Sequence, residues 1–196
     1  MKKENKNTGF TLIELLAVIV IMGVLMMAAI PAITNAITRS RKSTFASNAK
    51  ELINSVRTTI SSGDAVRTGG ETGICQFPPA NKEVRVSLTK KSISYLLERG
   101  GTQSSFGQEY GTSDDEEVGA VFIVNKGSTS GGGEFYDYYI FLKDTGGNGV
   151  ANSASGGVVA EDDVSRAYVQ VGTLAGKTAP TYAKKSGPTQ CTISTS

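Results

Sequence analysis

One long apolar run near the start of the chain limits what this sequence can fold into. Residues 15–33 carry no charged or polar side chain, and the next charge after Glu14 is Arg39. A helix needs ~20 residues to cross a bilayer, and residues 11–13 and 34–37 extend the run to that length. An acidic side chain in the centre of a membrane helix costs roughly 2.5 to 3.5 kcal/mol. We therefore expect Glu14, which directly precedes the run, to have a partner.

The charged residues and the missing histidine argue against several classes of function. Of the 20 basic and 18 acidic residues, three and one lie in residues 1–9, so the remainder is neutral. A neutral chain does not favour general binding of nucleic acid, and we predict no specific nucleic acid partner. The chain has no histidine, which removes the commonest metal ligand and the usual serine triad. We find no convincing catalytic set and predict no enzyme activity, catalytic residue, metal site or cofactor.

The two cysteines, Cys75 and Cys191, both lie in the segment that follows the apolar run. An even number of cysteines in an exported domain favours one disulfide. On the loop-entropy account, closing so long a loop stabilises the fold by roughly 4–5 kcal/mol. Two buried free thiols are the alternative. The spacing is too wide for a CxxC redox or zinc motif.

The helical pattern continues beyond the apolar run. Apolar residues recur at helical spacing from 45 to 60, and Gly63 follows as a stop signal. We predict one helix from about residue 11 to residue 62, apolar all round in its first half and amphipathic in its second. Gly23 and Pro31 lie in the first half, where a membrane or a packed bundle tolerates a proline with a local kink. The predicted apolar stripe consists of Phe45, Ala49, Leu52, Ile53, Val56 and Ile60.

After Gly63 the chain becomes glycine-rich, with strand-like runs between glycine turns. Runs 118–124 and 135–143 are apolar on both faces, which is typical of central strands in a covered sheet. The stripe on 45–60 can supply one cover. The predicted fold class is α+β, with a long N-terminal helix packed on a mainly antiparallel β-sheet. The predicted strands are 84–88, 118–125, 135–143 and 167–171, with weaker candidates at 158–160 and 190–194, and residues 90–99 are a predicted short helix.

Several charged segments have two readings each. The cluster Arg39, Arg41 and Lys42 could touch lipid headgroups, or it could be a solvated face. The acidic segments 114–117 and 162–163 could attract a cation. Residues 144–149 loosely resemble a calcium loop without the ligand spacing of an EF-hand. For all the acidic segments we favour solvated loops.

Two ordinary explanations for the N-terminus account for it poorly. A secretory signal peptide has a basic start, an apolar core and a cut at small residues such as 34–36. Here the apolar core is too long, and the helical stripe continues through that cut. A plain membrane anchor leaves Glu14 unexplained, and lysines and arginines flank the apolar run on both sides, so they do not orient it.

A third explanation comes from resemblance. The sequence Gly9-Phe10-Thr11-Leu12-Ile13-Glu14 and the apolar run after it resemble the signature of type IV prepilins and the related pseudopilins, over about residues 6–38. The resemblance implies that a membrane prepilin peptidase cuts between Gly9 and Phe10 and that the new Phe10 amine is N-methylated. The helix then leaves the bilayer and packs into a filament core. The shape implied for the subunit is a lollipop.

Cleavage would create a cation at Phe10, one helical turn before Glu14. In an apolar filament core neither charge is tolerable alone, and a salt bridge between neighbouring subunits satisfies both. The resemblance assigns this assembly role to Glu14. A one-residue slip would leave both charges unpaired, so the pair sets the register. Gly23 is interpreted as a helix-packing position and Pro31 as a kink or melted segment in the filament.

The chain is therefore divided into a leader (1–9), an apolar transmembrane and filament-core helix (10–38), an amphipathic helix (39–62) and a head (63–196). The predicted function is a type IV pilus subunit that supports adhesion, motility or surface colonisation. Its expected partners are prepilin peptidase, copies of itself in a helical filament, and the pilus assembly machinery in the membrane. It is expected in the cell membrane before assembly and on the cell surface afterwards. The span of the predicted disulfide favours a Gram-positive, clostridial-type source.

The alternatives are a minor pilin, or a pseudopilin of a type II secretion or DNA-uptake filament. From a different class, the alternative is a membrane-anchored surface-binding protein or enzyme.

Overall fold

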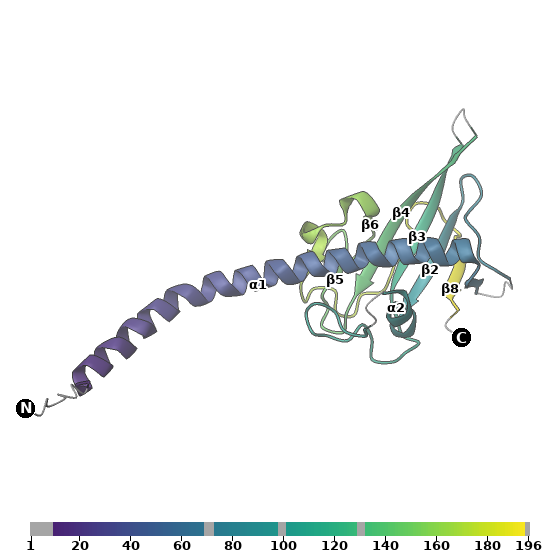
Figure 1. Ribbon diagram of the computed structural model, residues 1–196. Helices are drawn as coiled ribbons and strands as arrows, with labels where there is room; N and C mark the ends of the chain where they lie inside the picture. Colours follow the sequence, from purple (N-terminus) through teal and green to yellow (C-terminus); the bar gives the residue numbers. More distant parts are fainter. Residues whose placement is uncertain (1–9, 69–72, 98–100, 129–131, 195–196) are drawn as a thin grey trace, which may run out of the picture. The chain divides into compact units, whose positions relative to one another are not determined.

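Figure 1 shows the computed structural model, which describes residues 10–68, 73–97, 101–128 and 132–194. The chain divides into two compact units between Ser40 and Arg41. The described part of the first unit consists of residues 10–40 and is helical from Leu12 onward. The second unit combines a sheet with the rest of the same helix.

The helix α1 (Leu12–Ser62) confirms the prediction of one helix over about 11–62. Its end is closed at Gly63, which has a φ of 85°. The Gly63 amide donates to the Ile60 carbonyl at 3.3 Å, and the Asp64 amide donates to the Thr59 carbonyl at 3.0 Å. These two bonds form a Schellman motif, in which glycine supplies the left-handed residue.

The apolar stripe of α1 faces the sheet, as predicted. Its members from Phe45 to Val56 are fully buried, and Ile60 is 4% exposed. They share one core cluster with apolar side chains from the central strands, including Val86, Val121 and Ile140. The helical period of the sequence therefore places one face of α1 in the core of the second unit.

The sheet has the order β1-β8-β2-β3-β4-β5-β7, and β6 pairs with β4. All pairs are antiparallel except β2 with β8. The C-terminal strand thus lies between the strand that follows α1 and the centre of the sheet. The strands are β1 (Ala65–Arg67), β2 (Glu83–Thr89), β3 (Glu117–Ser128), β4 (Glu134–Lys143), β5 (Gly149–Val150), β6 (Val159–Ala160), β7 (Val169–Gln170) and β8 (Thr189–Ile193), and the short helices are α2 (Lys90–Leu96), η1 (Glu161–Asp163) and η2 (Arg166–Tyr168).

The central strands are buried on both faces over most of β3 and the second half of β4, as predicted, whereas Phe135 at the start of β4 is 54% exposed. On the face that meets α1, Val121 pairs with Ile140, and on the opposite face Phe122 pairs with Tyr139. Phe122 is fully buried. The opposite face is covered by chain between β7 and β8, whose Pro180 carbonyl accepts a hydrogen bond from Arg85 of β2 at 3.0 Å. The sequence did not indicate this cover.

Three sequence predictions for the second unit were wrong or incomplete. Residues 167–171 were predicted to be one strand, but Arg166–Tyr168 is a 3-10 turn and only Val169–Gln170 is a strand. Strands β1 and β5 were missed because two or three residues show no periodicity. The predicted helix 90–99 ends at Leu96, and its positions 98 and 99 lie outside the described residues.

Candidate functional site

The first turn of α1 is closed by Thr11 and Glu14. The backbone amide and the hydroxyl of Thr11 each donate to Glu14 Oε2 at 2.8 Å. The Glu14 amide donates back to Thr11 Oγ1 at 3.4 Å. This reciprocal pattern is a capping box, in which a Thr and a Glu three residues later satisfy the amides at a helix start. Both contacts use Oε2, so Oε1 takes no part in the cap.

The capping role of Thr11 was missed at the sequence level, although the signal was present. A Thr-x-x-Glu pattern directly before an apolar run is the usual signature of a capping box. The structure therefore shows that Glu14 has a local hydrogen-bond partner in the single chain. This contact neutralises no charge, because a threonine hydroxyl and a backbone amide are both neutral.

The rest of the first unit presents apolar side chains without cover. Phe10 is 88% exposed and Leu12 is 85% exposed. The best 18-residue window of α1 has a mean hydropathy of 2.7, and none of it is buried. By length and composition this part of the helix can cross a membrane. Because burying one large aliphatic side chain gains roughly 1.5–3 kcal/mol, the segment requires lipid or partner helices around it.

Gly23 and Pro31 lie on this uncovered part of α1. A Cβ added at Gly23 would meet nothing within 4 Å. Packing within the single chain therefore does not require glycine there. The helix is continuous through Pro31. The interpretations of Gly23 as a packing position and of Pro31 as a kink concern the assembled state and stay predictions. The predicted cleavage residue Gly9 lies outside the described residues.

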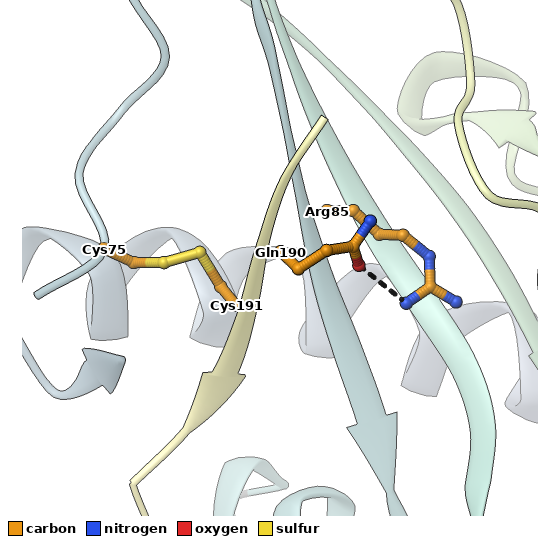
Figure 2. The surroundings of a disulfide bond; sticks show 4 residues. All are labelled: Cys75, Arg85, Gln190 and Cys191. Carbon is orange, nitrogen blue, oxygen red and sulfur yellow. Dashed lines mark hydrogen bonds between the residues drawn. A yellow bond between two sulfur atoms is a disulfide. The ribbon is translucent and has the colours of Figure 1, made fainter. Parts of the chain in front are cut away.

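In the head, Cys75 and Cys191 are joined by a disulfide (Figure 2). Both residues are fully buried, and their Cα atoms are 6.3 Å apart, within the range that a disulfide spans. Cys191 lies on β8, opposite Arg67 of β1 and Val86 of β2. The amide of Cys75 donates to the Ala65 carbonyl at 2.7 Å. The bond thus ties the segment beside β1 to the C-terminal strand.

A polar cluster lies on the opposite face of the same strands. Figure 2 shows Arg85 of β2 reaching Gln190 of β8, an interaction of 3.3 Å. Arg85 also donates to Glu117 Oε2 at 3.0 Å. Glu83 is 2% exposed and accepts backbone amides from Ala183, Lys184 and Lys185 at 2.7–2.9 Å. These charged residues hold the segment before β8 on the sheet, which is a structural role.

The prediction of solvated loops for the acidic segments was wrong at Asp144 and incomplete at Glu117, which is exposed but lies on a strand. Asp144 is 2% exposed, accepts the Ser104 hydroxyl at 2.6 Å, and accepts the Asn148 amide at 2.9 Å. Its carboxylate joins two neighbouring loops in place of binding solvent. Glu117 begins β3 and pairs with Arg85. Both positions depended on contacts with distant residues that the sequence pattern does not show.

The described part of the second unit offers surface hollows. Among the described residues, no group of three or more Cys, Asp or Glu side chains is placed to hold an ion. A hollow of about 920 Å³ lies between α1 and α2 and is lined mostly by polar side chains such as Asn54, Thr58 and Tyr95.

Comparison with known proteins identifies the N-terminal segment. Residues 5–30 match the family described as the prokaryotic N-terminal methylation motif. This motif is the prepilin signature, so the resemblance noted in the sequence is confirmed for that segment. Neither a search of curated proteins nor a search of solved structures found a match to the chain. The chain therefore carries the prepilin-type methylation motif at its N-terminus, and its clostridial-type source stays a prediction.

Proposed function

We propose that this chain is a structural subunit of a type IV pilus, polymerised through its N-terminal helix. One observation carries the proposal: a prepilin signature at residues 5–30 continues into the apolar first half of α1, whose most apolar stretch is uncovered in the single chain. The motif implies processing by prepilin peptidase and assembly into a filament. The uncovered helix supplies the surface that such an assembly buries.

The proposed sequence of events begins in the membrane. Prepilin peptidase hydrolyses the bond between Gly9 and Phe10, removes residues 1–9, and leaves a cationic amine at Phe10. N-methylation of that amine keeps its charge. In the bilayer the apolar part of α1 is solvated by lipid, and in the filament the helices of neighbouring copies take the place of the lipid.

Glu14 is proposed to set the register of assembly. In a dry helix bundle its carboxylate needs a cation, because the Thr11 contacts neutralise no charge. The Phe10 amine of a neighbouring subunit is the cation that processing creates. Glu14 Oε1, which the cap leaves unused, is available to that amine without opening the capping box.

The test is mass spectrometry of filaments sheared from cells that express the chain. We expect an abundant subunit that begins with N-methyl-Phe10. A processed subunit present only in trace amounts would indicate a minor pilin, and one in a short envelope-spanning filament would indicate a pseudopilin. An uncleaved chain found only in the membrane would contradict the proposal and favour an anchored surface protein.

The proposed biological setting is attachment, motility or colonisation through a surface filament. The pilin-type motif indicates a structural protein, which supports this setting over an anchored enzyme. Loss of surface adhesion or twitching in a deletion strain, restored by the wild-type chain, would support it. Unchanged adhesion and motility in that strain would contradict it.

A further inference from the structure

We propose that the head of the membrane-bound precursor docks on anionic phospholipid headgroups through Lys42, Lys50 and Arg166. We call these three residues the cationic face. The inference rests on the membrane-inserted precursor of the proposed function. It adds the surface by which the head meets the bilayer before assembly.

Two of the three cations line one surface hollow, and Lys42 lies on the same stripe of α1 as one of them. Lys50 of α1 and Arg166 of η2 line a hollow of about 400 Å³. Ala46 also lines this hollow. Lys42 lies four residues before Ala46 and Lys50 four residues after it, so Lys42, Ala46 and Lys50 share one stripe of α1. Serine hydroxyls on the rim can donate to phosphate oxygens. The serines that line the hollow are Ser43, Ser47 and Ser165.

Among the described residues, no partner neutralises the charges of the cationic face. Neither lysine nor Arg166 makes a side-chain hydrogen bond or ion pair within the part of the chain that the structure describes. By contrast, Arg57 further along α1 is held by Glu161 at 2.8 Å. A cationic surface without internal partners suits an external anion.

Acidic residues near the cationic face are directed elsewhere or already engaged. Glu51 already interacts with another group in the described structure. Asp162 and Asp163 of η1 line two other hollows. The hollow between Lys50 and Arg166 has no acidic residue in its lining.

The position along the chain favours a membrane as the source of that anion. The apolar run of α1 requires a bilayer before assembly, and Lys42 follows the end of that run by a few residues of the same helix. Arg39 and Arg41 lie in the same stretch. Cations next to an anionic leaflet each strengthen binding by about fivefold. The acidic surface of a second copy is the competing occupant.

The experiment uses the full-length chain in vesicles and exploits the absence of tryptophan. A Ser165→Trp reporter is placed beside Arg166 and keeps the three cations and the hydroxyls of Ser43 and Ser47. A Phe135→Trp reporter is placed at the opposite end of the head. The ring of Tyr138 on β4 contacts Arg57, which lies seven residues after Lys50 on α1. Phe135 lies three residues further along β4, on the side of Tyr138 where the strand begins. Anionic vesicles contain phosphatidylglycerol, and neutral vesicles contain phosphatidylcholine alone. Both carry a tracer lipid with a quencher attached to its headgroup.

We expect stronger quenching of the Ser165→Trp reporter in anionic vesicles than in neutral vesicles. This difference should disappear in 0.5 M salt, because the electrostatic screening length is then roughly 4 Å. Changing Lys42, Lys50 and Arg166 to Gln lowers the docked-to-undocked ratio by about a hundredfold. A matched control changes the exposed Lys82, Lys177 and Lys185 to Gln and leaves the quenching intact.

Three results would overturn the inference. Equal quenching of both reporters would mean non-specific adsorption of the whole head. If the control triple variant loses as much quenching as the variant of the cationic face, only the net charge of the head matters. If the Ser165→Trp emission changes with the protein-to-lipid ratio and not with lipid charge, the cationic face binds a second copy of the chain. Failure of the chain to float with vesicles after carbonate washing would instead contradict the membrane-inserted precursor itself.

Discussion

Thr11 and Glu14 hold each other at the start of α1, with the Thr11 amide and hydroxyl both 2.8 Å from Glu14 Oε2. The contact stabilises the helix start and fixes the carboxylate one turn from Phe10. It gives Glu14 two separable roles, a local cap that needs only an acceptor oxygen and a proposed contact between subunits that needs a charge. Substitutions can distinguish these roles.

The first prediction concerns the charge of Glu14. Glu14→Gln keeps an acceptor oxygen for the cap but loses the charge, so we expect normal cleavage after Gly9 and few or no filaments. Thr11→Ala removes the side-chain half of the cap, costs about 1 kcal/mol of helix stability and retains the charge, so filaments still form. For each variant, the measurements are the amount of processed subunit in cells and the amount of filament sheared from them. Wild-type filament yield from Glu14→Gln would refute the charge pairing.

The second prediction concerns the disulfide. Its residues are separated by 116 positions. On the loop-entropy account, opening such a loop costs roughly 4–5 kcal/mol, so the Cys75→Ser, Cys191→Ser double variant should unfold well below the wild type. Thermal unfolding of the full chain in detergent, followed by circular dichroism, measures this. Reductant should lower the wild-type midpoint to that of the double variant and leave the variant unchanged. A wild-type midpoint unaffected by full reduction contradicts the prediction.

The third prediction concerns Glu83 and the segment that covers the sheet. Glu83→Ala leaves the amides of Ala183, Lys184 and Lys185 without their acceptor. Hydrogen bonds to a charged group contribute about 1.5–3 kcal/mol each in favourable cases, so the segment should open locally. We expect faster hydrogen exchange at these amides, with β3 and β4 still protected. Asp162→Ala, at an exposed carboxylate, is the control and should change neither. Unchanged exchange in Glu83→Ala would show that other contacts hold the cover.

The fourth prediction is a pH dependence that comes from Glu109. Lys90 Nζ lies 2.9 Å from Glu109 Oε2, and this contact, with Gln103 and Thr102, lowers the pKa of Glu109 to about 2. A carboxyl whose pKa falls on folding stabilises the protein above its unfolded pKa of about 4.3 and loses that contribution as the pH falls toward 2. Glu109→Gln should therefore show a flatter decline of the unfolding midpoint between about pH 5 and pH 2. An identical decline in both proteins would contradict this assignment.

The fifth prediction compares two glycines. A Cβ at Gly149 would lie 2.0 Å from the Leu142 carbonyl oxygen, so Gly149→Ala should destabilise the head. Gly23→Ala meets nothing within 4 Å and should stabilise the isolated helix by about 1 kcal/mol, because alanine is the better helix former. If Gly23 packs against a neighbouring helix, Gly23→Ala lowers filament yield with the fold intact. Normal filaments from this variant would remove the packing role.

Local patterns carried most of the elements that could be predicted. The stripe from Phe45 to Ile60 predicted both the extent and the buried face of α1, because a 3.6-residue period is a property of neighbouring residues. The continuous apolar runs in 118–125 and 135–143, set between glycine turns, located β3 and β4, because a run of neighbouring residues is also a local pattern. The two-residue strand β5 carries too few residues for any period, so it was missed.

The candidate site also contains features that local sequence patterns predict. The prepilin signature, the apolar run and the position of Glu14 are contiguous, so the sequence by itself determined that the chain has a processing motif and a helix that needs lipid or partners. The Thr11 cap was also readable there. These features depend on residues within one or two helical turns, where spacing along the chain equals proximity in space.

Only the tertiary structure decided what happens between distant residues. It inserted β8 between β1 and β2, brought Cys191 to Cys75, and buried Glu83 beneath amides about a hundred positions away. A carboxylate such as Asp144 was read as solvated from its neighbours and was found 2% exposed. Burial and pairing depend on which strand edges and loops meet in space, and that is a property of the packed chain as a whole.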